Sequence, residues 1–376
     1  MTQIQAKTVQ PDIKRLVQKL QNAAPKRPSV VVMPDFFLDR IVTYPKDLHS
    51  FINDMARIAE QKGGNIDGVP QKEIRGGNAV NTASALAKLG VKVHPIICTD
   101  KFGYALIKLF LEGLDVDLSH VKIRECLSIT TAIELHAEEG KVNVMLRDLG
   151  SLADFSPKDL SPEDFRLIEE ADYVCIFNWA GTRRFGTQLA EEIFKRVKTK
   201  GRGKTYLDTA DPSSNKAEIP QLVKKVMLKH FVDILSVNEN EAIWYASYFE
   251  PEKVAKHKKR LKTEALAKEC AQILAEHLDT RIDLHTTRFS MSIFEDRSLV
   301  VPAFDVEVKQ ATGAGDAWNA GNIYADSQGF KAEARLTFAN AVAAYYVSSL
   351  EAAHPTLAEL RGFLLSKSSK TFSKIW

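Results

Sequence analysis

The sequence lacks any apolar run long enough to cross a bilayer. Its longest runs, such as residues 173–177 and 96–98, span only a few positions, whereas a membrane-spanning helix needs about 20 apolar residues. The first residues also lack the apolar stretch that a signal peptide requires. These two absences predict a cytoplasmic protein with no membrane partner.

Clustered cysteines and an excess of charge of one sign are lacking too. The four cysteines, Cys98, Cys126, Cys175 and Cys270, stand singly, so buried free thiols are expected rather than a zinc site or a disulfide framework. The 51 basic residues nearly balance the 48 acidic ones and leave a formal net charge of +3. Such a balance gives no strong long-range field, and we predict no nucleic-acid partner.

Two well-known phosphate-binding loops are also missing. A dinucleotide-binding enzyme needs G-x-G-x-x-G after its first strand, where this chain has the residues MPDFFLD from Met33 to Asp39. The loop G-x-x-x-x-G-K-[ST] occurs nowhere in the chain. These absences exclude a nucleotide-dependent oxidoreductase and a P-loop enzyme.

The sequence does have an ordinary globular composition, with 45% hydrophobic and 26% charged residues. Its length predicts one large domain, alone or carrying a small one. Short β-branched runs alternate with helical stretches, which predicts an α/β fold with a mostly parallel central sheet flanked by helices. The expected strands are residues 91–98, 173–177, 205–208, 234–238 and 282–286.

Three segments depart from this alternation. Residues 1–28 predict an N-terminal helical extension. Residues 40–75 combine a strand with a helix over 47–62, and residues 121–147 predict hairpins that turn at Glu139-Gly140. We interpret 40–75 and 121–147 as a lid subdomain, and we assign to the core the residues 29–39, 76–120 and 148–376.

The segment TGAGD, from Thr312 to Asp316, leads directly into a predicted helix. Gly313 and Gly315 leave the backbone bare, so N–H groups at the helix N-terminus can hold a phosphate or the charge that develops on it. A carboxylate at Asp316 would repel a bound phosphate, but it can accept a proton from an attacking hydroxyl. The alternative is a structural loop in which Asp316 caps the helix.

A second segment, RGGNAVN from Arg75 to Asn81, places two amides at the start of another predicted helix. Asn78 and Asn81 lie about one turn apart, and amides can read sugar hydroxyls both as donors and as acceptors. Helix capping is the alternative use of either amide.

The order and separation of these segments resemble the two signatures of the ribokinase or PfkB carbohydrate kinase family. The resemblance covers residues 29–362 and implies a ribokinase-like fold with a small inserted β-sheet lid. It implies Asp316 as the general base and an anion hole of Gly313, Ala314 and Gly315. The implied acceptor site comprises Asp35, Asp39, Gly76, Gly77, Asn78 and Asn81. The implied nucleotide contacts are Asn238, Thr286, Thr287 and Asn340, with Glu241 organising Mg²⁺ through its waters.

The chain departs from the family pattern at three places. Gln310 and Ala311 stand where an acid and a threonine are usual, which leaves potassium activation open. The residues LHTTRFSMSIF replace a glycine-containing turn on the nucleotide side, so the choice between ATP and ADP as donor also stays open. Asn78 stands where ribokinases proper often have lysine, and the acceptor need not be ribose.

Arginines indicate one class of acceptor. Arg75, Arg147 and the pair Arg183-Arg184 lie where ligand loops are expected, and arginines hold phosphates by bidentate hydrogen bonds. As a set they favour a phosphosugar, although each one alone can be a solvated surface residue.

We therefore predict a kinase that uses Mg²⁺ to transfer the terminal phosphoryl group of ATP, or of ADP, to a hydroxyl of a sugar or sugar phosphate. The alternatives are a nucleoside kinase and a non-catalytic sugar or nucleotide sensor on the same fold. An exposed edge of the lid sheet would be a natural contact for a homodimer.

Overall fold

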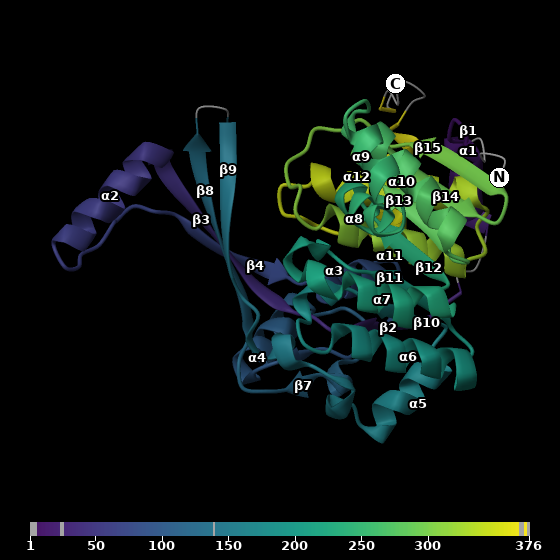
Figure 1. Ribbon diagram of the computed structural model, residues 1–376, viewed down its shortest axis with the longest axis horizontal. Coiled ribbons are helices and arrows are strands. Elements are labelled where there is room, and N and C mark those ends of the chain that lie inside the picture. The colour runs from purple at the N-terminus through teal and green to yellow at the C-terminus, as the bar shows by residue number, and fades with distance from the viewer. Residues whose placement is uncertain (1–5, 23–25, 138–139, 368–371, 374–376) are drawn as a thin grey trace.

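A nine-stranded sheet forms the centre of the molecule in the computed structural model, which describes residues 6–22, 26–137, 140–367 and 372–373 (Figure 1). The strand order is β1-β15-β14-β13-β12-β11-β10-β2-β5. All neighbours run parallel except at β14, which is antiparallel to both β13 and β15. The mostly parallel sheet predicted from the alternating pattern is therefore observed.

The strands of this sheet are β1 (Lys7–Thr8), β2 (Ser29–Met33), β5 (Lys92–Pro95), β10 (Tyr173–Ile176), β11 (Lys204–Asp208), β12 (Ile234–Val237), β13 (Arg281–His285), β14 (Phe289–Phe294) and β15 (Arg297–Pro302). A second sheet contains β4 (Gln71–Gly76), β3 (Phe37–Asp47), β8 (Ser128–Ala137) and β9 (Gly140–Asp148). A third, two-stranded sheet pairs β6 (Cys98–Thr99) with β7 (Lys122–Ile123).

The α-helices in the described residues are α1 (Ile13–Asn22), α2 (Leu48–Glu60), α3 (Asn78–Lys88), α4 (Lys101–Phe110), α5 (Pro162–Glu170), α6 (Gly186–Lys200), α7 (Ile219–Lys225), α8 (Glu239–Phe249), α9 (Pro251–Lys258), α10 (Thr263–His277), α11 (Ala314–Ser327), α12 (Ala332–Ser348) and α13 (Leu357–Leu365).

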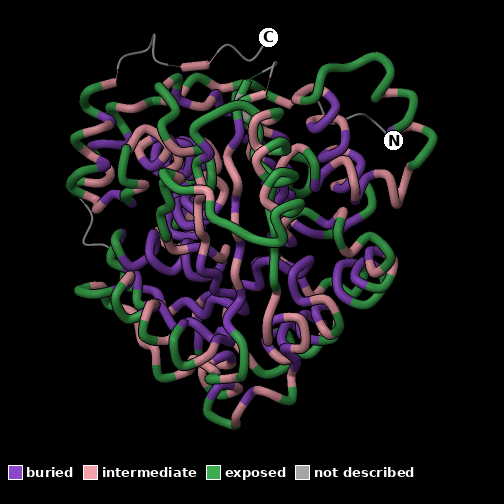
Figure 2. Tube along the Cα trace, turned by 90° about the vertical axis from the view of Figure 1, so that its left-hand side faces the viewer, coloured by how far each residue is buried: buried purple, intermediate pink, exposed green. Residues whose placement is uncertain are grey.

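Alternate side chains of the central strands feed two separate cores. Val31 and Val174 pack with α5, α6, α7, α8 and α10 on one face of the sheet, whereas Val32 and Cys175 pack with α3, α11 and α12 on the other. This follows from the two-residue period of a strand, which sends successive side chains to opposite faces. Both faces are thus buried, and buried residues fill the centre of the molecule in Figure 2.

The N-terminal segment adds more than the predicted helix. Leu16 and Val17 of α1 are buried against the core that α12 and α13 share. The short strand β1 pairs in parallel with β15 and extends the edge of the main sheet. The predicted extension therefore also takes part in the central sheet, a pairing that needs backbone hydrogen bonds rather than any apolar pattern.

The second sheet, β4-β3-β8-β9, projects from the body and carries α2 at its far end (Figure 1). Strands β3 and β8 pair in parallel, and β4 and β9 flank them in antiparallel orientation. Asp47 caps α2 by accepting from the Ser50 N–H at 2.7 Å. Of the predicted turn at Glu139-Gly140, Glu139 lies outside the described residues.

The boundaries of this lid differ from those predicted. Strand β3 already begins at Phe37, whereas Lys122 and Ile123 pair with β6 on the body instead of with the lid. The backbone of Lys122 donates to the Ile97 carbonyl at 2.7 Å. Pairing partners far apart in the sequence decided these limits, and a local pattern does not specify such partners.

Two expectations drawn from the absences meet different outcomes. Cys98, Cys175 and Cys270 are buried and free, but Cys126 is exposed, so its predicted burial was wrong. Among the described residues, no helix has both the length and the apolar character needed to cross a membrane.

Candidate active site

The start of α11 combines a glycine turn with unpaired backbone donors. Gly313 precedes the helix with φ of 88°, and a Cβ there would lie only 2.4 Å from the Tyr346 hydroxyl oxygen. Within the described residues, the N–H groups of Gly315 and Asp316 make no hydrogen bond. The N–H of Ala314, which the resemblance placed in the anion hole, instead donates to the Ala311 carbonyl at 3.2 Å. The free donors at this helix end can hold an anion.

Asp316 lies in the first turn of α11 and is only 5% exposed. Its Oδ1 accepts from Asn78 Nδ2 at 2.9 Å, and its Oδ2 accepts from Asn81 Nδ2 at 2.9 Å. Burial raises the pKa of this carboxyl well above its usual value, and the nearby charges of Asp208 and Asp35 act in the same direction while both amides oppose it. Asp316 is therefore a buried carboxyl with a high proton affinity, as a general base requires.

The two amides are held by the start of α3. The Asp35 carboxylate accepts from the N–H groups of Asn78 and Ala79, each at 2.9 Å, and from Asn178 Nδ2 at 2.8 Å. It thus caps α3 and ties it to the end of β10. Asp35 is fully buried and does not line the cavity described below, so the structure gives it a supporting position where a substrate contact was predicted.

Gly77, which precedes α3, cannot be replaced without strain. Its φ is 92°, and a Cβ would approach Phe36 Cα to 2.8 Å and the Asp35 carbonyl oxygen to 3.0 Å. These neighbours are backbone atoms, which cannot rotate away. Glycine here lets the chain cross close behind β2 and brings both amides to Asp316.

A cavity of about 230 Å³ opens between the lid and the body, with Asp316 in its wall. The lid side of the cavity is formed by Phe37, Asp39, Thr130, Met145 and Arg147. The body side is formed by Gly77, Asn78, Asn81, Asn178, Ala180, Ala210, Asp211, Thr312, Gly313 and Asp316. Residues predicted from four separate segments therefore meet around one small polar space.

Asp39 is the carboxylate of the lid wall. Burial raises the pKa of Asp39 to about 6, while a hydrogen bond with Thr130 and the charge of Arg147 oppose the rise and Asp35 adds to it. The neighbouring Gly76 must be glycine, because a Cβ there would lie 2.3 Å from the Asp39 carboxylate. The place of Gly76 is thus to make room for the Asp39 side chain.

The raised pKa of Asp39 predicts an acid limb in substrate capture. An ionised Asp39 can accept hydrogen bonds from acceptor hydroxyls, and protonation below a pKa of about 6 removes that capacity. We expect kcat/KM to fall as the pH drops through about 6, and Asp39→Asn to remove this limb while raising KM. A limb that persists in Asp39→Asn, measured beside the exposed control Asp115→Asn, would assign it to another group.

The arginines separate into different environments. Arg147 lines the cavity, with its guanidinium 5.2 Å from the centre of the Phe37 ring. Arg183 donates to the Ser214 carbonyl, and Arg184 pairs with Asp154 at 3.0 Å on the surface. Neither lines the cavity. Arg75 lies inside the protein, bonded to Asn81 and Ser84. Of the predicted set, only Arg147 is placed to meet an acceptor.

The predicted nucleotide side begins where β12 meets α8. Asn238 caps α8, and its Oδ1 accepts from the Glu241 N–H at 3.0 Å. Both Glu241 carboxylate oxygens accept in return, one from the Asn238 N–H at 3.0 Å and one from Asn238 Nδ2 at 2.8 Å. Burial and the charge of Asp208 raise the pKa of Glu241 well above its usual value. This capping box leaves Glu241 little freedom to bind a metal ion directly.

Carboxylates gather around this capping box. Asp208, Asp211 and Glu239 all act electrostatically on Glu241. In the described part of the chain, however, no group of three or more histidine, cysteine or acidic side chains has the arrangement of a metal site. The arrangement fits a hydrated Mg²⁺ held partly by substrate phosphates, which is how that ion is commonly bound, better than a cage made of protein ligands.

The remaining nucleotide-side predictions have local partners. Thr286 Oγ1 donates to the Phe289 carbonyl at 2.9 Å within the turn between β13 and β14, and the Thr287 N–H donates to Glu239 at 3.2 Å. Asn340 is buried, where its Oδ1 accepts from Trp318 Nε1 at 2.9 Å and its Nδ2 donates to the Pro302 carbonyl at 3.1 Å. A nucleotide contact by Asn340 would require breaking these bonds, since its amide is already engaged.

Several residues of the site escaped the sequence prediction. Thr130, Asn178 and Phe37 line the cavity, and Asp208 is the buried acid nearest the two sides. Asn178 and Asp208 could have been found, because each follows or ends a predicted parallel strand at the edge where ligands bind. Thr130 carried no such signal, because its place depends on how β8 pairs with β3.

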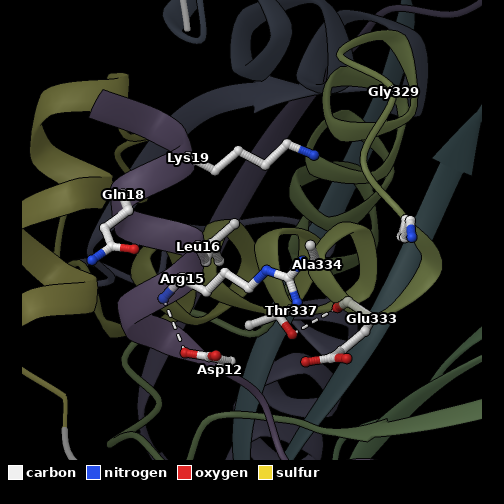
Figure 3. Close-up of a pocket in the computed structure, with 10 residues that line it drawn as sticks. Asp12, Arg15, Leu16, Gln18, Lys19, Gly329, Glu333, Ala334 and Thr337 are labelled. Carbon is white, nitrogen blue, oxygen red and sulfur yellow. Dashed lines mark hydrogen bonds between the residues drawn. The ribbon is translucent and has the colours of Figure 1, made fainter. Parts of the chain in front are cut away.

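A larger hollow of about 460 Å³ lies between α1 and the start of α12, and it shares no lining residue with the first cavity (Figure 3). Its polar groups include Asp12, which accepts from the Arg15 N–H at 2.9 Å, and Thr337, which donates to the Glu333 carbonyl at 2.8 Å. No buried side-chain atom lining it lacks a partner. The hollow therefore offers no unpaired group for a ligand.

Comparisons with known proteins agree with this geometry. The family model described as "pfkB family carbohydrate kinase" matches residues 50–359. The bifunctional protein HldE of Sulfurimonas denitrificans is 23% identical over 306 residues, which cover 79% of this chain. The match spans only 57% of the length of that curated relative.

Solved structures share the fold. Ribokinase of Arabidopsis thaliana, complexed with ribose and ATP, has a TM-score of 0.66 at 20% identity and covers 91% of this chain and 100% of its own. Adenosine kinase of Sinorhizobium meliloti has a TM-score of 0.67 at 16% identity, covering 89% and 98%. The predicted ribokinase-like fold is thereby confirmed. Because the family model matches most of the sequence, this chain belongs to the pfkB family of carbohydrate kinases.

Proposed function

We propose that this chain transfers the terminal phosphoryl group of a nucleotide, ATP in the first instance, to a hydroxyl of a sugar or sugar phosphate. The observation that carries the proposal is the placement of Asp316, a buried carboxyl beside two unpaired N–H groups in the wall of a polar cavity. A base next to an anion site is what in-line attack of a hydroxyl on phosphorus requires.

In the proposed reaction, the acceptor hydroxyl approaches Asp316 and takes the place of one amide donor. Asp316 accepts the hydroxyl proton as the oxygen attacks the terminal phosphorus. The N–H groups of Gly315 and Asp316, with the α11 dipole behind them, stabilise the charge on the transferred group. On the acceptor side, Asp39 accepts hydrogen bonds from neighbouring hydroxyls and orients the sugar.

Mg²⁺ would neutralise phosphate charge when bound, and the carboxylates around Asn238 and Glu241 are the residues that would hold its waters. The lid would close over the acceptor and exclude water, which would otherwise be phosphorylated in its place. Asp39, Thr130 and Arg147 lie on the lid side of the cavity, so the position of the lid also sets the position of the acceptor.

The acceptor class follows from the lid wall. Arg147 is a cation facing the cavity, which supports an acceptor that already carries a phosphate. Phe37 in the same wall could instead stack a base, and the likeness to adenosine kinase keeps a nucleoside as the second candidate.

A donor-by-acceptor screen tests the proposal. Purified protein is mixed with Mg²⁺, with ATP or ADP, and with panels of free sugars, sugar phosphates and nucleosides, and phosphorylated products are detected by mass spectrometry. We expect one class of acceptor to be phosphorylated by the native chain and not by Asp316→Asn. Tight binding of a nucleotide and an acceptor, measured by calorimetry, with no transfer to any acceptor would favour the non-catalytic sensor.

The lid edge is the proposed contact of a homodimer. Strand β9 has no partner on its outer side in the described sheet, and its Val144, Met145 and Leu146 are exposed. Pairing with a second copy would satisfy this edge and cover its apolar side chains. We expect light scattering to give twice the chain mass, and Val144→Lys with Leu146→Lys to give a monomer. A native monomer at all concentrations would contradict the pairing.

A further inference from the structure

Arg75, near the end of β4, carries a buried guanidinium surrounded by neutral acceptors. Its Nε donates to Asn81 Oδ1 at 3.0 Å, its Nη1 donates to Ser84 Oγ at 2.9 Å, and its Nη2 lies 3.4 Å from His354 Nδ1. The imidazole is neutral, because burial and then the charge of Arg75 hold the pKa of His354 well below its usual value. Within the described residues, no carboxylate forms an ion pair with this guanidinium.

The negative charge that compensates Arg75 is one residue further away. Burial lowers the pKa of Arg75, and Tyr346 and Asp316 oppose that effect. Burial raises the pKa of Tyr346 to about 12, so this phenol is neutral at physiological pH. Asp316 therefore remains as the anion that a buried guanidinium needs, and Asn81 lies between the two charges.

Hydrogen-bond direction links these three residues. A guanidinium can only donate, so Asn81 must turn its carbonyl oxygen toward Arg75 and its NH₂ group toward the catalytic carboxyl. Asn81 Nδ2 then donates to Asp316 Oδ2 at 2.9 Å, and that oxygen has to act as an acceptor. With Arg75 absent, the amide could turn over and present its oxygen, which would favour a protonated Asp316.

We propose that Arg75 is a positioning residue that locks Asn81 as a donor to Asp316 and thereby keeps the carboxylate free to accept the substrate proton, an inference that rests on the proposed kinase function. Asn78 has no such lock, since its Oδ1 makes no hydrogen bond within the described residues. Asn78 is accordingly the amide that the acceptor hydroxyl displaces, and Asn81 stays in place. The two amides, equivalent in the sequence, have different parts.

Other charged and titratable groups also face Asp316. Asp208 at the end of β11 and Asp35 before β3 raise its pKa. Tyr346 on α12 is neutral, and so is His285 on β13, whose pKa burial lowers to about 4. None of these groups contacts Asn81, so an effect transmitted through Asn81 is separable from theirs.

The test is a direct titration of Asp316, which needs no substrate. The full chain, labelled with ¹³C in aspartate, is titrated by NMR, and the Asp316 signal is assigned with Asp316→Asn. Arg75→Gln keeps the size and polarity of the side chain but can present either end to Asn81, and we expect its Asp316 midpoint to move upward. Arg75→Lys restores a group that only donates and should return the midpoint toward the native value.

A cycle with Asn81→Ala shows whether the effect passes through the amide. We expect Asn81→Ala to move the midpoint upward too, and the double variant to move no further than the larger single shift. Additive shifts, or a native midpoint in either single variant, would overturn the proposal. Should Arg75→Gln not fold, an unshifted midpoint in Asn81→Ala overturns it alone. The exposed control Arg166→Met, paired only with Glu163, should leave the titration unchanged.

Kinetics give a second measurement. We expect kcat of Arg75→Gln near pH 7 to fall about tenfold, as one unit of pKa shift would produce, and to recover as the pH rises, with KM for the nucleotide unchanged. An equal loss at every pH would indicate a merely structural role. Absence of turnover by the native chain with every donor and acceptor would refute the proposed function, and the NMR titration would still be readable.

Discussion

Replacing Asp316 with asparagine is expected to lower kcat by about 10²–10⁴-fold, the usual contribution of a general base, while the nucleotide affinity stays close to native. Asparagine keeps the shape of the side chain but cannot take the proton of the acceptor hydroxyl. Single-turnover phosphoryl transfer and calorimetric nucleotide binding measure the two quantities separately. Near-native turnover would remove Asp316 from the mechanism.

The same substitution should not destabilise the protein. Because burial raises the pKa of Asp316 in the folded state, the stabilising contribution of this group is complete below its unfolded value and is lost as the pH rises through the raised value. Asparagine removes that penalty. We expect the melting temperature of Asp316→Asn to match or exceed the native one at pH 8, with the difference shrinking toward acid pH. The exposed Asp115→Asn serves as control for both measurements.

Replacing Asp35 with alanine is expected to lower the free energy of unfolding by about 3 kcal/mol, because buried donors left without an acceptor cost roughly 1–3 kcal/mol each. The donors are the N–H groups of Asn78 and Ala79 and the amide of Asn178. Relief of burying the carboxyl, whose pKa burial raises, offsets part of the loss. Urea denaturation followed by circular dichroism measures the change.

Asp100 provides a matched comparison. It caps α4 by accepting from the Gly103 N–H at 2.7 Å, but it has this single backbone partner and is not fully buried. Asp100→Ala is expected to cost about 1 kcal/mol, as for an ordinary helix cap. An Asp35→Ala variant no less stable than Asp100→Ala would show that Asp35 does not hold α3 in place.

The alternation of apolar runs and helical stretches was sufficient to predict the main sheet. Strands buried on both faces have a nearly continuous apolar sequence, as β2 and β10 do. The lid was harder to delimit, because its strands take partners from distant segments, as when β3 pairs with β8. The short strand β1 was missed, since two residues at a sheet edge leave no periodic signal.

The site was predicted where glycine and a functional side chain stand together in the sequence. The TGAGD segment predicted the turn at Gly313, whose positive φ the structure shows. Individual side chains were less predictable. Asp35 supports α3 from inside, Asn340 bonds within the core, and Arg183 bonds to a carbonyl away from the cavity. Each outcome depends on which groups compete for the same donor or acceptor in three dimensions.

The sequence by itself determined the α/β class, the kinase family signatures and the identity of the carboxyl beside the anion site, because short-range periodicity and glycine spacing are local properties of the chain. Only the tertiary structure decided what each polar side chain faces. The bond from Arg75 to Asn81 turns one of two similar amides into a fixed donor, and burial gives Asp316 its high proton affinity. Hydrogen-bond partners and desolvation arise from contacts between distant segments, which local sequence patterns do not encode.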